Sequence, residues 1–126
     1  MLADDYRAYL ATLDERRYAD LDRHVHDELT YNGAPLTRAA YAARLADDAR
    51  VIPDLRYEVR LLVVDGDQVA ARLWFDCHPR GRFLGVETDG RRLGFAEHVL
   101  YRYDAGRIRE VWSLIDVDAV RAQMAA

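Results

Sequence analysis

Apolar residues recur at intervals of three or four in the first half of the chain, which predicts helices. The first predicted helix carries this spacing at Leu2, Tyr6, Leu10 and Leu13, and a shorter second one carries it at Tyr18, Leu21 and Val25. Residues 27–36 predict a short strand that ends in a loop containing Gly33 and Pro35. The first half therefore consists mainly of helices.

A third helix is predicted to begin after Thr37. Leu36 precedes this residue and Tyr41 follows it by four positions, which matches a helix N-cap with a hydrophobic staple. The apolar spacing continues through Leu45 and Ala49, and Pro53 lies just beyond the predicted end.

Apolar and polar residues alternate with period 2 in the second half, which predicts strands. One predicted strand places Leu55, Tyr57, Val59, Leu61 and Val63 on a single face, and its return strand does so with Val69, Ala71, Leu73, Phe75 and Cys77. Asp65 and Gly66 lie between the two strands and predict a tight hairpin turn.

The remaining residues predict a second hairpin. Residues 79–92 contain several glycines and arginines and predict a loop or a bulged sheet edge. Strands at 93–103 and 107–116 follow, joined by a short turn at 104–106, and 117–125 predicts a final helical turn. Helices followed by consecutive hairpins predict an α+β fold, with the helices packed on one face of a curved antiparallel sheet in a single domain over residues 1–126.

Composition narrows the functions that this domain can have. The formal net charge is -4, which gives no basic footprint for nucleic acid, and all 18 basic residues are arginine. Cys77 is the one cysteine, so no internal disulfide is expected. No run of about 18 apolar residues predicts a membrane span, and the acidic, amphipathic start predicts no signal peptide. We therefore expect a cytoplasmic protein that acts without nucleic acid or membrane.

Several segments together resemble the SnoaL-like polyketide cyclase branch of the nuclear transport factor 2-like (NTF2-like) superfamily. They are His78, GRFLGVETDGRR at 81–92, LYRYDAGRIREVW at 100–112, and Asp116. The resemblance implies a cone-shaped α+β fold and acid–base catalysis of an intramolecular aldol ring closure without metal or cofactor. It also implies an Asp directly after the Trp of the last strand, where this chain has Ser113. A serine is no general base near neutral pH without an activating partner, so another residue must supply the chemistry.

Glu97 is the first candidate for that residue. It falls on the predicted apolar face of the strand at 93–103, where a carboxylate is costly without a partner or a role. Burial would raise its pKa, and it could then remove an acidic proton next to carbonyl groups. The alternative is a structural ion pair with an arginine such as Arg72 or Arg91.

His98 and Asp76 are the other catalytic candidates. On a regular strand His98 faces away from Glu97, toward an outer or dimer face, and only a bulge would turn it into the cone. Asp76 and His78 share one face of their strand with Arg72 and Trp74. That face could line a pocket, where the Asp–His pair would act as a base, or it could form a subunit interface.

Four further side chains, with His78, are candidates for binding a substrate. Tyr9 and Tyr31 could donate hydrogen bonds to a ligand carbonyl, Ser113 could hold an enolate oxygen, and Trp112 could stack on a ring. Each also has a plain packing role as the alternative. His24 and His26 are two histidines without a matching carboxylate or cysteine cluster, so no metal site is expected.

Two functions follow from these residues. The first is a cofactor-independent cyclase or isomerase that acts by acid–base catalysis on a hydrophobic, polyketide-like or aromatic small molecule. The second is a non-catalytic accessory protein that binds a small molecule or forms a homodimer on the same fold. A homodimer through the outer sheet face is compatible with both.

Overall fold

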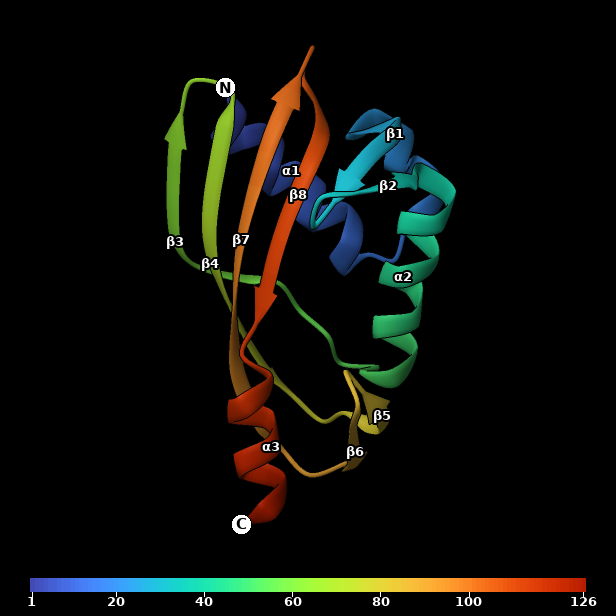
Figure 1. Ribbon diagram of the computed structural model, residues 1–126, viewed down its shortest axis with the longest axis vertical. Coiled ribbons are helices and arrows are strands. Elements are labelled where there is room, and N and C mark those ends of the chain that lie inside the picture. The colour runs from blue at the N-terminus through green and yellow to red at the C-terminus, as the bar shows by residue number, and fades with distance from the viewer.

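The computed structural model describes residues 1–126 as a curved sheet with helices on its concave side and at its lower end (Figure 1). The helical elements are α1 (Leu2–Asp14), the 3-10 helix η1 (Tyr18–Arg23), α2 (Arg38–Val51) and α3 (Val117–Ala125). The strands are β1 (Val25–Tyr31), β2 (Ala34–Thr37), β3 (Glu58–Asp65), β4 (Gln68–Cys77), β5 (Arg80–Phe83), β6 (Val86–Asp89), β7 (Leu93–Asp104) and β8 (Arg107–Ile115). No helix is long and apolar enough to cross a membrane.

The main sheet has the strand order β2-β1-β8-β7-β4-β3, and β5 and β6 form a separate two-stranded hairpin. All neighbours in the main sheet are antiparallel except β1 and β8, which run parallel. Figure 1 shows α2 standing opposite the long strands, with the β5–β6 hairpin below it. The space between these layers holds the candidate site.

The structure confirms the predicted helices and the cap of the third one. The backbone N–H of Ala40 donates to Oγ1 of Thr37 at 3.1 Å, which satisfies one of the free donors at the start of α2. The helix at the C-terminus is capped in the same way, since the N–H of Ala119 donates to Oδ1 of Asp116 at 3.1 Å. Val25, however, begins β1 rather than ending the second helix.

The predictions for residues 27–36 and 79–92 are wrong, because each segment contains a tight turn between two strands. Residues 27–36 are two strands rather than one, because Asn32 (φ 49°) and Gly33 (φ 83°) make a tight turn between β1 and β2. Residues 79–92 also contain a hairpin rather than a loop, with its turn at Leu84 (φ 49°) and Gly85 (φ 80°). Both turns use left-handed residues, and the second brings the buried side chain of Phe83 toward the sheet.

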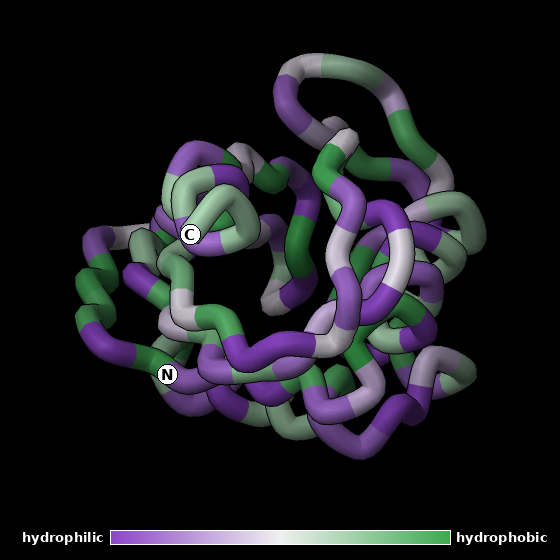
Figure 2. The backbone as a smooth tube through the Cα atoms, turned by 90° about the horizontal axis from the view of Figure 1, so that it is seen from below, coloured by the Kyte–Doolittle hydropathy of each residue, from purple (hydrophilic) through white to green (hydrophobic).

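Burial alternates along β4 and β7 as predicted for the inner face of the sheet. The hydropathy colours along the chain in Figure 2 show hydrophobic and hydrophilic residues following each other closely. The pairing of β4 with β7 is unbroken from Gln68 opposite Arg102 to Cys77 opposite Leu93. The inward side chains of these two strands pack against the helices: Val69, Ala71, Leu73, Phe75 and Cys77 from β4, and Leu93, Phe95, Val99, Tyr101 and Tyr103 from β7.

Strand β3 breaks the predicted alternation. Its pairing with β4 shifts between Val59 and Leu61, so two residues of β3 are accommodated where a regular ladder would have one. The predicted inward positions of Leu61 and Val63 are therefore wrong, and both side chains lie on the outer face, 59% and 52% exposed. A single bulge moves every later side chain of a strand to the other face.

Candidate active site

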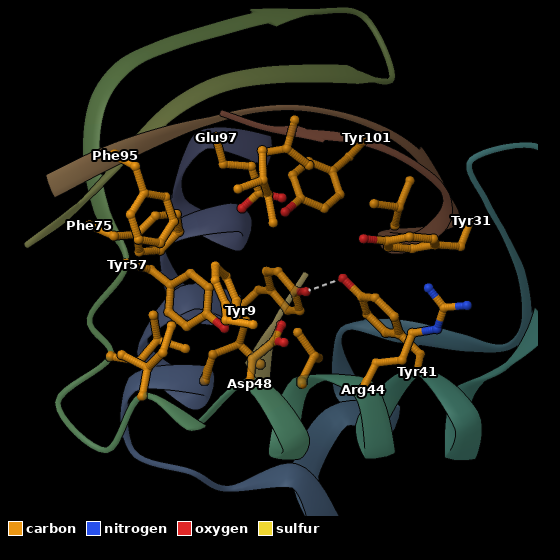
Figure 3. A pocket seen from close by; sticks show the side chains of 18 residues that line it. Tyr9, Tyr31, Tyr41, Arg44, Asp48, Tyr57, Phe75, Phe95, Glu97 and Tyr101 are labelled. Carbon is orange, nitrogen blue, oxygen red and sulfur yellow. Dashed lines mark hydrogen bonds between the residues drawn. The ribbon is translucent and has the colours of Figure 1, made fainter. Parts of the chain in front are cut away.

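The candidate site is a cavity between the concave face of the sheet and helices α1 and α2 (Figure 3). Its free internal volume is about 60 Å³, within a wider hollow of about 630 Å³ that extends into the open mouth, and 15 of its 18 lining residues are hydrophobic. The aromatic residues of the wall are Tyr9, Tyr31, Tyr41, Tyr57, Phe75, Phe83, Phe95 and Tyr101. The charged residues are Arg44, Asp48 and Glu97. The mixture of aromatic walls and few polar groups is typical of a small-molecule site.

Glu97 points into this cavity from β7, as its place on the apolar face predicted. Its carboxylate accepts a hydrogen bond from the hydroxyl of Ser113 on the neighbouring strand β8. Burial raises the pKa of Glu97 above its usual value, against the opposing effect of the Ser113 hydrogen bond, and the charge of Asp48 raises it further. The ion pair considered as an alternative is not formed, because Arg72 contacts His98 and Arg91 contacts Asp89.

Ser113 explains how the site tolerates the loss of the expected Asp. The resemblance implies an acidic residue directly after Trp112, and the structure places a serine there that donates to a carboxylate from the next strand. The acidic group thus remains at this part of the wall, although Glu97 on β7 supplies it. The serine hydroxyl acts here as a hydrogen-bond donor to this carboxylate.

The opposite wall carries a second carboxylate that the sequence analysis missed. Tyr41, Arg44 and Asp48 line the cavity from one face of α2, spaced three and four residues apart. Burial, assisted by the charge of Asp47, raises the pKa of Asp48 to about 6, while Arg44 opposes the shift. The signal that could have found these residues is the i, i+3, i+7 spacing, which places two charged side chains beside Tyr41 on the helix face toward the core.

The tyrosines supply neutral hydrogen-bonding groups. The hydroxyls of Tyr9 and Tyr41 are 2.6 Å apart and share one hydrogen bond. Burial raises the pKa of both hydroxyls well above the usual value, and it also raises the pKa of Tyr31. The guanidinium of Arg44 lies over the ring of Tyr31, 4.8 Å from its centroid. Tyr9 and Tyr31 both line the cavity.

The structure places His98 outside this cavity. The unbroken pairing of β4 with β7 leaves no bulge at His98, so its side chain lies on the outer face. There its Nε2 is 2.6 Å from Nη1 of Arg72. The arrangement that would have turned His98 into the cone does not occur.

Three other predicted site residues also lie apart from Glu97. Asp76 is on the outer face and forms a two-pronged ion pair with Arg92, at 2.7 and 2.8 Å, which lowers the pKa of its carboxyl. His78 does not contact Asp76, because its Nδ1 pairs with Asp54 at 2.8 Å. Trp112 points outward from β8 and is 47% exposed.

The histidines considered for a metal have other neighbours. Nε2 of His24 is 3.1 Å from Oγ1 of Thr12, and Nε2 of His26 is 2.7 Å from the carbonyl oxygen of Asp104. No group of three or more His, Cys, Asp or Glu side chains is placed to hold a metal ion. The groups that can move protons in the cavity are the two carboxyls and the tyrosine hydroxyls.

Comparison with known families and structures agrees with this architecture. The profile of the SnoaL-like polyketide cyclases matches residues 3–124. The crystal structure of a SnoaL-like polyketide cyclase from Agrobacterium tumefaciens is 40% identical in sequence, with 98% of each chain covered and a TM-score of 0.95.

More distant structures share the fold. TsrD from Streptomyces laurentii is 24% identical over 99% of this chain and 95% of its own, with a TM-score of 0.86. IdmH, described as a putative polyketide cyclase from Streptomyces antibioticus, is 20% identical over 98% of both chains, with a TM-score of 0.85. A search of curated protein sequences gave no match.

Proposed function

Because the chain belongs to the SnoaL-like polyketide cyclase family, we propose that it is a cofactor-independent cyclase or isomerase. Its substrate is a hydrophobic, polyketide-like or aromatic small molecule, and it acts by acid–base catalysis. The observation that carries this proposal is the Glu97 carboxylate, which points into an aromatic cavity with only the Ser113 hydroxyl as a hydrogen-bond partner. A desolvated carboxylate with a raised pKa is suited to removing a proton from carbon.

The proposed reaction begins when Glu97 takes a proton from a carbon flanked by carbonyl groups. The electron pair of the C–H bond forms an enolate. In a ring closure the enolate carbon then attacks a second carbonyl carbon, and the new alkoxide oxygen takes the proton that Glu97 removed, which restores the Glu97 carboxylate. In an isomerisation the proton returns to a different carbon. Ser113 holds the Glu97 carboxyl in position during both steps.

The developing charge on the substrate oxygen needs hydrogen-bond donors. Tyr31 faces the same cavity, and the Tyr9–Tyr41 pair offers one hydroxyl proton that the pair does not use internally. A tyrosine hydroxyl is neutral at physiological pH, and burial raises the pKa of these hydroxyls further, so they remain hydrogen-bond donors. Donors fixed in an apolar cavity stabilise an oxyanion far better than water does.

The alternative is a non-catalytic protein that binds the same class of molecule. The replacement of the expected Asp by Ser113 favours it, since that position carries the expected acid–base group in the resemblance. In this case the cavity would bind a ligand and Glu97 would only contribute to affinity.

We also propose that a second copy of the chain covers the outer face of the sheet. Its large exposed apolar side chains come from three strands: Leu61 and Val63 from β3, Leu100 from β7, and Trp112 and Leu114 from β8. A contiguous apolar surface of this kind marks an interaction site in soluble proteins. Arg72 and His98 lie within this surface, in the row of paired residues between Leu61 and Leu114, and their side chains contact each other. The next row, Val63, Ala70, Leu100 and Trp112, is apolar throughout, and a two-fold axis would place it against the same row of the second copy.

The first experiment is native mass spectrometry of the purified protein, followed by solvent extraction of any bound molecule. We expect a dimer that carries an aromatic or polyketide-like compound. That compound is then incubated with the wild type and with Glu97→Gln, and the product is followed by chromatography. We expect the substitution to lower turnover by about 100-fold or more, the range for loss of a general base.

The matched control is Glu87→Gln, which makes the same change at an exposed glutamate paired with Arg82 on the β5–β6 hairpin. It should leave turnover unchanged. Unchanged turnover in Glu97→Gln would overturn the catalytic role of Glu97. A changed affinity without any turnover in the wild type would support the binding protein instead.

A further inference from the structure

Asp48 is a carboxylate that the proposed role of Glu97 leaves unexplained. It lines the cavity from α2 and is only partly exposed. Its carboxylate has no hydrogen-bond partner in the protein, and burial rather than a charge partner dominates its environment. Unpartnered carboxylates in apolar surroundings are costly and need a reason.

A structural ion pair does not supply that reason. Arg44 lies one helical turn before Asp48, at the spacing that commonly pairs opposite charges. Its guanidinium instead lies over the ring of Tyr31, 4.8 Å from the centroid, and forms no ion pair with Asp48. The neighbouring Asp47 shows the ordinary alternative, because it is exposed and pairs with Arg50 on the helix surface.

Asp48 and Glu97 lie on opposite walls of the cavity, and this arrangement suggests a role for the Asp48 carboxylate. Figure 3 shows Glu97 directed into the cavity from the sheet wall and Asp48 directed into it from the helix wall, with aromatic side chains between them. A flat molecule in this cavity would have one carboxyl on each side. The titratable and charged groups that interact electrostatically with Asp48 are Arg44 and Asp47 on α2, Tyr18 on η1, Tyr31 on β1, Tyr57 before β3 and Glu97 on β7.

We propose that Asp48 is the second catalytic residue of the site and donates a proton to the substrate oxygen from the helix wall, while Glu97 removes the carbon proton from the sheet wall. The inference rests on the function proposed above and deepens it. The substrate class is a flat, enolisable carbonyl compound whose acidic C–H and carbonyl oxygen reach opposite walls.

The two proton transfers of this enolisation need no reactant other than the substrate and the two carboxyls. The ionised Glu97 takes the carbon proton, the C–H electron pair forms a C=C bond, and the carbonyl oxygen takes the proton of Asp48 to give an enol. Glu97 is then protonated and Asp48 is ionised. Return of a proton to carbon from Glu97, and of the O–H proton to Asp48, restores both groups. The active enzyme therefore carries one proton on the two carboxyls.

The chemical environment agrees with this division of roles. Burial places the pKa of Asp48 at about 6, so an appreciable share of the molecules carries a proton there near neutral pH. The charge of an ionised Asp48 also makes ionisation of Glu97 less favourable, which favours the form with one proton on the two groups. Two carboxyls with opposite tasks in one site are a recurrent arrangement for acid–base chemistry.

The test uses 2-tetralone, a flat bicyclic ketone with acidic C–H groups next to its carbonyl. Its exchange of these hydrogens for deuterium in D2O is followed by proton NMR with the wild type, Glu97→Gln, Asp48→Asn and Asp47→Asn. We expect the wild type to accelerate the exchange and Glu97→Gln to lower the rate by about 100-fold or more. Asp48→Asn should lower it at least about 10-fold. Asp47→Asn removes an exposed charge that raises the pKa of Asp48, so it should move the high-pH side of the profile to lower pH but lower the rate at the pH optimum less than about 2-fold.

A pH profile separates proton donation from a structural effect. The wild-type rate should rise and then fall with pH, because only the form with one proton is active. Asp48→Asn should lose the falling limb, since its remaining carboxyl needs only to be ionised. Near-ultraviolet circular dichroism of each variant checks that the aromatic core is unchanged.

Each failure has its own meaning. Exchange at the wild-type rate in Asp48→Asn, together with its loss in Glu97→Gln, would overturn the role of Asp48 and leave the proposed function standing. Wild-type exchange in Glu97→Gln would overturn the assignment of the base and the inference built on it. No acceleration by the wild type would overturn the proposed function for enolisable ketones, and the inference with it.

Discussion

The two faces of the same sheet differ in a way that reverses the usual arrangement. The inner face is apolar but carries a carboxylate at Glu97, held by Ser113 in an aromatic cavity. The outer face is exposed, yet it presents large apolar side chains such as Leu61 and Leu114. Each face thus contains the residue type that its environment disfavours.

These exceptions are informative because both carry a free-energy cost. A carboxylate out of water loses solvation, and a leucine in water orders the solvent around it. Outer-face carboxylates form ion pairs, as Asp76 does with Arg92 and Glu110 with Arg102, whereas neither inner carboxyl pairs with an arginine. We interpret the unpaired inner carboxyls and the exposed apolar side chains of the outer face as sites where another molecule binds. On the inner face this is a small molecule in our proposal, and on the outer face it is a second copy of the chain.

Truncating one leucine on each face to alanine gives the largest expected difference in stability between the two faces. Leu73 is 1% exposed on the inner face, and Leu114 is 74% exposed on the outer face. Leu73→Ala should lower the free energy of unfolding by about 2–5 kcal/mol, because it leaves a cavity in the core. Leu114→Ala should change it by about 0.5 kcal/mol or less, measured by urea unfolding of the dilute monomer. Equal effects would show that the outer face is packed within the monomer.

The outer face can be disrupted without touching the core. The double substitution of Leu61 and Leu114 by Arg places two charges within the apolar surface and should weaken the proposed dimer by about 100-fold or more. Analytical ultracentrifugation over a range of concentrations gives the dissociation constant. Leu84→Arg is the control, because Leu84 is 48% exposed but lies in the turn of the β5–β6 hairpin. A monomeric wild type would rule out the dimer altogether.

Ionising a buried carboxyl costs free energy, so the free energy of unfolding should depend on pH. The pKa of Asp48 is raised from its ordinary value of 3.8 to about 6, so the folded protein keeps this proton to higher pH than the unfolded chain does. The free energy of unfolding should therefore fall as pH rises from about 4 to about 6 and then level off. Asp48→Asn should be more stable than the wild type by about 1–3 kcal/mol at pH 7 and equal to it near pH 3.5, measured by urea unfolding. Equal stability at both pH values would show that Asp48 is well solvated.

The sequence alone was sufficient to predict that Glu97 points inward, because its strand alternates regularly and its neighbours on that face are all apolar. It was not sufficient for Asp48. Asp48 is one of several charged residues on α2, and only its spacing from Tyr41 and Arg44 indicates that it lies on the helix face toward the core. Nor could it decide which face His98 occupies, since that depended on whether a bulge interrupts the sheet at this residue. The pairing around His98 is regular, and the register shifts lie elsewhere, after Val59 in β3 and after Arg102 in the β7–β8 pair.

The sequence by itself determined the order of the elements, the α+β class and the inner face of β4 and β7, because local periodicity is set by the geometry of helices and strands. It also carried the family resemblance, which the structural neighbours confirm. Only the tertiary structure decided the parallel pairing of β1 with β8, the exposure of Leu61, and the meeting of Glu97 with Ser113 and Asp48 across one cavity. These features depend on strand register and on contacts between distant segments, and no local pattern encodes either of them.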